Sequence, residues 1–262
     1  MIKKIRDKLE GRVFLQALFV GLIGVTGAFL YNVSDLFLAT KEELETLTSQ
    51  YANELSSLLI WSSISTFILV FIAYFLGYKS RQRINIANNN VNKKIGFIAV
   101  IVTIVISVLL YILDYKVYYN NVNYFVPIVF NPVELLTNIV HSGTVEEIIL
   151  RWGLTSFIIW MFYNIFSKRD DSGKKKPITK PIIISAVIFS TLLVFFFQLQ
   201  EIVNFYSQSW LIFIRSFINY FCIGLLLNSI YVKYGLKWSI ILHIIFIIVY
   251  TGICPIALYL FV

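Results

Sequence analysis

The sequence has little charge, cysteine, proline or histidine, and each shortage excludes a class of protein. Charged residues make up 14% of its 262 residues, whereas soluble domains carry about 25%. With 58% hydrophobic residues, a soluble fold of this length could not hide its apolar surface, so most of the chain must face lipid. The two cysteines, Cys222 and Cys254, both lie in apolar stretches, which argues against a disulfide framework or a zinc site.

Long apolar runs are the main feature that is present. Runs longer than about 18 residues recur, which is the length that crosses a hydrocarbon core of about 30 Å as a helix. Alternating strand patterns are missing, so a helical bundle is favoured over a β-barrel. We predict an all-α polytopic transmembrane bundle of seven spans, or eight if the tail folds back at Pro255. The predicted spans are 13–31, 56–77, 95–113, 144–166, 181–197, 210–231 and 238–262.

The net charge of +8 is distributed as expected for a membrane protein rather than a nucleic-acid-binding one. Basic residues gather at the N-terminus, in the connection 79–94, which has no acid, and in the connection 168–180. The first connection, 32–55, is acidic. We therefore predict a multi-pass protein of the bacterial cytoplasmic membrane with a cytoplasmic N-terminus, no cleaved signal and no nucleic-acid partner.

A few ionisable side chains fall inside predicted spans, where each charge costs at least about 2.5–3.5 kcal/mol and needs a reason. Glu147 and Arg151 are four residues apart, so they share a helix face and can pair. Glu146 points about 100° away, which leaves one acid available as a general base or a ligand. The alternative is that all three charges only join helices. The residues concerned are Glu146, Glu147, Arg151, Arg215 and His243.

Arg215 has a simpler interpretation than the other four. It lies about five residues inside its predicted span. A long basic side chain at this depth can reach the interface or meet an acid on a neighbouring helix. We therefore expect Arg215 to be structural.

Three motifs in the C-terminal half carry a resemblance to a known family. Residues 146–153 read EEIILRWG, residues 195–200 read FFFQLQ and residues 234–243 read YGLKWSIILH. In order and spacing they resemble the EExxxR, FxxxH and final histidine motifs of the CAAX-protease and bacteriocin-processing (Abi) family of intramembrane peptidases. The resemblance covers about residues 132–246. It suggests N-terminal transmembrane helices over 1–126 and a CAAX-protease-like core over 127–262.

The resemblance also implies roles for particular residues. Glu146 would be the general base acting on water, Glu147 and Arg151 would hold the site together, and His243 would donate a hydrogen bond to the oxyanion. Such an arrangement is physically sensible, because a carboxylate in a low-dielectric cavity gains basicity and oriented donors stabilise developing charge.

The sequence departs from the family pattern at two positions. Gln200 stands where the FxxxH histidine is expected, and Ile247 stands where an asparagine follows the final histidine. A glutamine can still donate a hydrogen bond but cannot exchange a proton near neutral pH, and an isoleucine can do neither. His141 is the one other histidine and is a candidate for the missing imidazole, with an interfacial position as the alternative.

Depth in the membrane raises a further question. Counted at about 1.5 Å per residue from Lys168, Glu146 lies near the outer face, whereas His243 lies nearer the inner face. For the two to meet, the fourth span must bend near Gly153, or the predicted topology is wrong in one half.

Three functions remain open. The first is an intramembrane endopeptidase acting on a membrane-bound peptide or protein. The second, which the two departures favour, is a non-catalytic descendant that binds another membrane or envelope protein or confers bacteriocin immunity. A small transporter is the third, but no inverted repeat supports it. We expect no cofactor and no bound metal. One good histidine and two adjacent acids are a poor ligand set for zinc, which usually takes three or four protein ligands.

Overall fold

The structure is a computed structural model that describes residues 2–38, 41–84, 93–119, 129–173, 175–205 and 210–261. Side chains are described within these ranges except at 2–10, 31–38, 41–56, 58, 93, 118, 200–205 and 261. In these ranges the chain is helical apart from short connections and one isolated bridge between Arg169 and Lys175. The predicted all-α class is therefore confirmed.

Seven helices are long and apolar enough to cross a membrane, which confirms the seven-span prediction for the described residues. The chain is a multi-pass membrane protein. The first three spans lie in α1 (Ile2–Leu38), α2 (Lys41–Ile84) and α3 (Lys93–Leu113) with η1 (Asp114–Tyr118). The fourth joins α5 (Pro132–Val140), η2 (His141–Thr155) and α6 (Ser156–Phe166), and the fifth lies in α7 (Lys180–Phe205). The sixth joins α8 (Trp210–Ser216), η3 (Phe217–Cys222) and α9 (Ile223–Tyr234), and the seventh joins α10 (Leu236–Ile247), η4 (Ile248–Ile253) and α11 (Cys254–Phe261).

Segments of π-helix, with i→i+5 hydrogen bonds, occur inside four of the spans. In the seventh span, such a π-helical segment lies close to a proline. A proline inside an α-helix removes one hydrogen bond and clashes with the carbonyl four residues earlier. Pro255 is the second residue after the π-helical segment η4, and the span runs on from Leu236 to Leu260. The chain does not fold back at Pro255, so the eight-span alternative is wrong.

The fourth span begins earlier than predicted. Its helix starts at Pro132, where the Asn131 side chain caps it by accepting hydrogen bonds from the backbone N–H groups of Val133 (2.9 Å) and Glu134 (3.3 Å). The predicted start at residue 144 was wrong, because the polar residues of 132–143 lowered the hydropathy there. Since the span is 35 residues long, Glu147 lies near its middle. His243 lies 2.9 Å from Glu147, so the fourth and seventh spans do meet at this depth.

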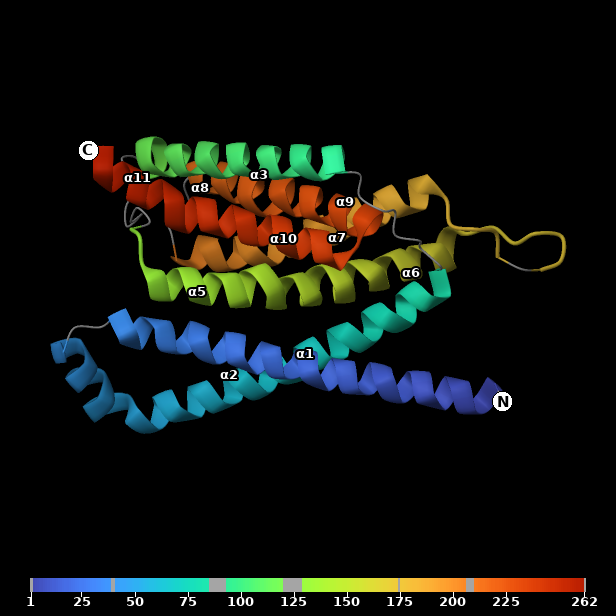
Figure 1. Ribbon diagram of the computed structural model, residues 1–262, viewed down its shortest axis with the longest axis horizontal. Helices are drawn as coiled ribbons and strands as arrows, with labels where there is room; N and C mark the ends of the chain where they lie inside the picture. The colour runs from blue at the N-terminus through green and yellow to red at the C-terminus, as the bar shows by residue number, and fades with distance from the viewer. Residues whose placement is uncertain are drawn as a thin grey trace.

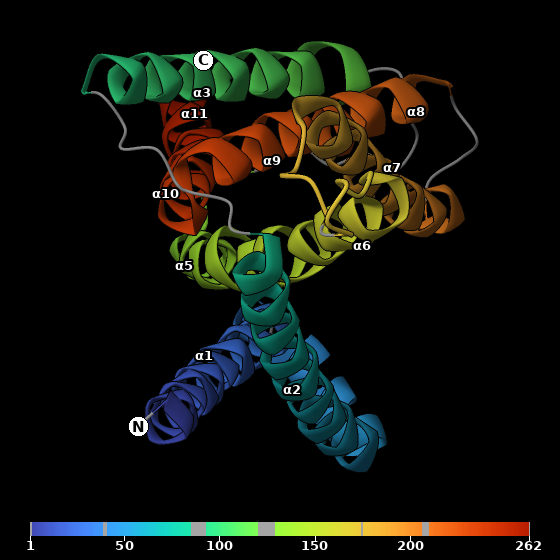
Figure 2. The same ribbon diagram turned by 90° about the vertical axis from the view of Figure 1, so that its right-hand side faces the viewer.

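The seven spans form a body with a two-helix arm. Figure 2 shows α3, α5–α6, α7, α8–α9 and α10–α11 gathered in the body, while α1 and α2 lie together on the side of α5 and α6 and diverge away from it. In Figure 1 the N-terminus, the end of α2 and the α6–α7 connection all lie at one end of the molecule. That end carries the basic segments; which side of the membrane it faces stays a prediction.

The arm meets the body at a close helix crossing. A Cβ atom on Gly77 of α2 would overlap the Trp152 carbonyl oxygen, and one on Gly153 would lie 2.6 Å from the Cβ of Ala73. The indole N–H of Trp152 donates to the Tyr74 carbonyl oxygen at 2.8 Å. Small residues therefore let the backbones of α2 and η2 touch, as is typical of helix packing in membranes.

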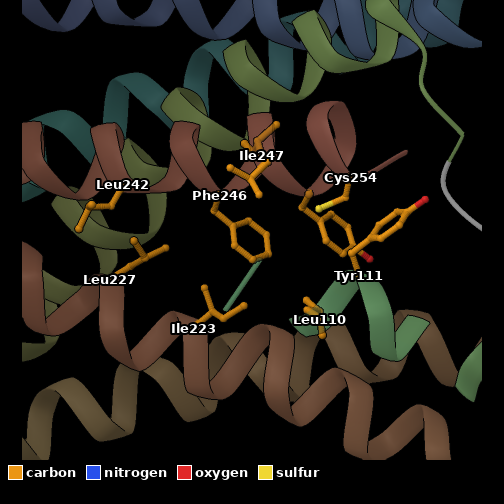
Figure 3. Packing of buried hydrophobic residues seen from close by; sticks show 10 residues of the cluster. Leu110, Tyr111, Ile223, Leu227, Leu242, Phe246, Ile247 and Cys254 are labelled. Carbon is orange, nitrogen blue, oxygen red and sulfur yellow. The ribbon is translucent and has the colours of Figure 1, made fainter. Parts of the chain in front are cut away.

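The largest buried apolar cluster lies between α3, α9 and the seventh span (Figure 3). Ile247 belongs to this cluster and is only 4% exposed. The cluster comprises Leu110, Tyr111, Ile223, Leu227, Leu242, Phe246, Ile247, Val249, Tyr250 and Cys254. It fixes α10 beside η2, on the side where the polar residues of the two helices meet.

Candidate functional site

A fully buried carboxylate, Glu147, is the centre of the polar contacts between η2 and α10. The Nδ1 atom of His243 lies 2.9 Å from Glu147 Oε1, and the Ser239 hydroxyl donates to Oε2. The Arg151 guanidinium forms an ion pair with Oε1, at 3.5 Å from its Nε atom. Because both oxygens are engaged by neighbouring donors, Glu147 is an anchor for its surroundings rather than an available base. We call Glu147, Arg151, Ser239 and His243 the Glu147 cluster.

His243 is oriented by this contact. A carboxylate only accepts hydrogen bonds, so the proton of the shared hydrogen bond lies on Nδ1 of the imidazole. The other ring nitrogen, Nε2, makes no hydrogen bond to the described residues. It is left as an acceptor when His243 is neutral and as a donor when His243 is protonated.

Arg151 is buried with its hydrogen-bonding capacity largely unused. Its side chain is 6% exposed, and its Nε atom has no hydrogen-bond partner among the described residues. The 3.5 Å approach to Glu147 is an ion pair and not a hydrogen bond. A guanidinium carries five N–H donors, and buried donors are normally satisfied.

Glu146 lies in a more open environment than Glu147. Its side chain is 35% exposed, accepts a hydrogen bond from the Ser142 hydroxyl at 3.1 Å and lies 3.6 Å from Nδ1 of His141. His141 and Glu146 are five residues apart, a spacing that the wide turn of the π-helix η2 places on one face. In an α-helix, residues five apart do not face each other. The π-helix therefore brings a histidine to Glu146 that α-helical spacing does not predict.

Four of the five predicted site residues are brought together. Glu146, Glu147 and Arg151 lie on η2, and His243 reaches them from α10. The fifth, Gln200, lies in α7, and its side chain is outside the described residues. The roles predicted for these residues are not tested by their positions.

Ile247, at the position of the expected asparagine, packs into the apolar core. A Cβ atom on Gly143 would lie 3.4 Å from its Cδ1 atom. This side of the site is therefore closed by hydrocarbon and offers no donor.

A second buried group of charges was missed by the sequence analysis. Arg215 Nε donates to Asp114 Oδ1 at 2.8 Å, and its terminal nitrogen donates to Asp114 Oδ2 at 3.0 Å and to the Tyr250 hydroxyl at 3.1 Å. The Tyr250 hydroxyl also donates to Asp114 Oδ2. Asp114 was overlooked because the third span was predicted to end at residue 113, whereas it runs to Val117. We call Asp114, Arg215 and Tyr250 the Asp114 cluster; Arg215 meets an acid on a neighbouring helix, as one of our two expectations had it.

Uncharged polar side chains continue the polar face of the fourth span. The Thr155 hydroxyl bonds the Asn228 side-chain oxygen at 2.9 Å, and the Asn228 amide donates to the Thr191 hydroxyl at 2.8 Å. One residue further, Ser156 and Tyr231 share a hydroxyl–hydroxyl hydrogen bond of 2.5 Å. These contacts tie η2 and α6 to α7 and α9 and hold the helix that carries Glu146 and Glu147.

Metal binding is not indicated by the described side chains. Among them, no group of three or more His, Cys, Asp or Glu residues is arranged to hold an ion. The absence of a metal and of a cofactor stays a prediction.

Comparison with known proteins gives one finding. Residues 127–249 match the family model described as "Type II CAAX prenyl endopeptidase Rce1-like". The matched region includes Glu146, Glu147, Arg151, Gln200 and His243 and excludes Asp114 and Tyr250. No curated protein and no solved structure matches the chain.

Proposed function

Because the chain belongs, through residues 127–249, to the Rce1-like family of type II CAAX prenyl endopeptidases, we propose that it is a glutamate-dependent intramembrane endopeptidase. Glu146 is the general base that activates a water molecule. Its substrate class is a membrane-anchored peptide or protein. The protein resides in the bacterial cytoplasmic membrane with its N-terminus in the cytoplasm, which reporter fusions at the two ends of α1 would test.

The difference between the two adjacent carboxylates carries this proposal. Glu147 is fully buried and engaged by three donors, whereas Glu146 is 35% exposed in the middle of a 35-residue span. A general base must be able to reach the proton that it abstracts. Glu146 meets this condition through its exposure, while Glu147 orients His243 and pairs with Arg151.

The test compares wild-type protein with Glu146→Gln, which keeps size and polarity but removes the base. The purified proteins, reconstituted in liposomes, would be given internally quenched peptides, one farnesylated with a CAAX-type tail and others carrying a single membrane anchor. In cells, new protein N-termini would be mapped in strains expressing either form at equal levels. We expect cleavage by the wild type and a loss of about 10²–10⁴-fold in Glu146→Gln.

Glu134→Gln is the matched control, because it removes a carboxylate from the same span outside the site. Its cleavage rate should equal that of the wild type. If neither peptides nor cellular proteins are cut in a Glu146-dependent manner, the endopeptidase proposal is wrong.

A second candidate is the non-catalytic descendant that the sequence favours. The specific observation behind it is Ile247, which puts a buried hydrocarbon side chain where the family has an asparagine donor. In this case the protein acts by binding another membrane or envelope protein, or in bacteriocin immunity. A biological output that survives Glu146→Gln but is lost on changing lipid-facing residues such as Trp61 or Phe19 would support it.

A further inference from the structure

The sequence lacks two groups that the proposed reaction uses, and η2 carries two nitrogen-bearing side chains close to where they are needed. His141 stands five residues before Glu146 and Arg151 stands five residues after it. All three lie on η2, where i→i+5 hydrogen bonds set the pitch. The 3.6 Å distance between His141 and Glu146 is a direct result of this spacing. Arg151 forms its ion pair with Glu147, the residue next to Glu146.

The separation of His141 from Glu146 suits a bridging oxygen. At 3.6 Å, Nδ1 and Oε1 are beyond an ordinary hydrogen bond, for which about 2.7–3.2 Å is typical. An oxygen atom placed beside the pair can reach both at hydrogen-bond distance. Both side chains are partly exposed, at 24% and 35%, so such an oxygen has access.

Arg151 is the stronger indicator, because its Nε–H donor is buried and makes no hydrogen bond among the described residues. The residue is 5% exposed, and Nε bonds no acceptor among the described residues. A buried donor that is left unsatisfied destabilises the fold, and a charged one does so more strongly. A guanidinium held in this way is suited to binding the oxygen of a ligand.

We propose that His141 and Arg151 are catalytic residues of this chain, which serve in place of the groups missing at Gln200 and Ile247. This inference rests on the proposed endopeptidase function. His141 holds the attacking water against Glu146. Arg151 donates to the carbonyl oxygen of the scissile peptide bond as it becomes an oxyanion.

The proton and bond changes then balance without any further reagent. Glu146 takes a proton from water as the water oxygen forms a bond to the carbonyl carbon, and Arg151 stabilises the resulting oxyanion. The oxyanion collapses, the C–N bond breaks and Glu146 passes its proton to the leaving amine. Glu147 accepts hydrogen bonds throughout and does not react.

The experiment measures kcat and KM for His141→Gln and Arg151→Lys with the peptide that the wild type cleaves. Loss of an oxyanion donor typically costs about 10²–10³-fold, so we expect a kcat reduction of that size in Arg151→Lys with KM little changed. His141→Gln should lose about 10²-fold, and added imidazole should restore part of the rate in His141→Gly. Restoration by imidazole would not occur if His141 were only structural.

Arg215→Lys is the matched control for Arg151→Lys. It weakens a buried arginine–carboxylate pair in the same way but lies in the Asp114 cluster, so kcat per folded molecule should be unchanged. If His141→Gln and Arg151→Lys keep kcat within threefold of the wild type, the inference is wrong while the endopeptidase proposal stands. Absence of Glu146-dependent cleavage in the wild type would overturn both.

A second measurement does not depend on turnover. A high-resolution structure of the wild type in a lipid nanodisc should show an ordered oxygen, from water or ligand, bonded to Arg151 Nε and near the Glu146 carboxylate. If no ordered oxygen is bonded to Arg151 Nε, the inference is wrong whatever the activity.

Discussion

The Glu147 cluster and the Asp114 cluster both bury charge between helices, and they differ in what they leave unused. In the Asp114 cluster the carboxylate accepts two hydrogen bonds from Arg215 and one from Tyr250, so acid and base neutralise each other. The Glu147 cluster binds its carboxylate with two hydrogen bonds and one ion pair, but it leaves Nε of Arg151 without a hydrogen bond among the described residues. It also adjoins a half-open carboxylate, Glu146. A closed ion pair is suited to holding helices, and an incomplete one is suited to binding.

Breaking the closed cluster should give the largest effect on stability. Asp114→Asn would leave the Arg215 charge buried and uncompensated, which typically costs about 3–5 kcal/mol. We expect the free energy of unfolding in mixed detergent micelles to fall by this amount. The cleavage rate per folded molecule should stay at the wild-type value. If the rate falls instead in proportion to that of Glu146→Gln, the two clusters are not functionally separate.

An intermediate effect is expected from Ser239→Ala. The Ser239 hydroxyl is buried and donates to the Glu147 carboxylate, and hydrogen bonds to charged groups contribute about 1.5–3 kcal/mol. The unfolding free energy should decrease within that range. An unchanged value would mean that His243 and Arg151 alone suffice to hold Glu147.

The smallest effect is expected from Ser142→Ala, which removes the corresponding hydroxyl from Glu146. This hydrogen bond is partly exposed, so its loss should cost no more than about 0.5–1.5 kcal/mol. Measured beside Ser239→Ala in the same micelles, the smaller loss would confirm that Glu146 is the more open carboxylate. Equal losses would contradict the distinction on which the endopeptidase proposal depends.

Hydropathy and motif order predicted most of the fold. The seven spans followed from the composition of successive windows, because a lipid-exposed helix must be apolar along its length. Two boundaries failed where polar residues lie inside a span. Asp114 resembled the edge of a span because Arg215 lies 101 residues away, and residues 132–143 looked too polar to be inside one.

The sequence predicted which residues form the site but not how they are arranged. Glu146, Glu147, Arg151 and His243 could be selected because intramembrane charges are rare and matched known motifs. The contacts that distinguish these side chains could not be predicted from the sequence, since a π-helix leaves the same hydropathy pattern as an α-helix. An α-helical wheel separates His141 from Glu146, whereas the structure places them 3.6 Å apart.

The π-helical pitch of η2 has a consequence for how this site could be lost or gained. If η2 took α-helical pitch with its sequence unchanged, His141 and Glu146, which are five residues apart, would no longer face each other. Composition and motif letters would be the same, but the carboxylate and the imidazole would not meet. A single-residue deletion between them would instead give four-residue spacing, at which an α-helix places two side chains on one face. The pitch of the segment 141–151 is thus as much a determinant of this site as the identity of its residues.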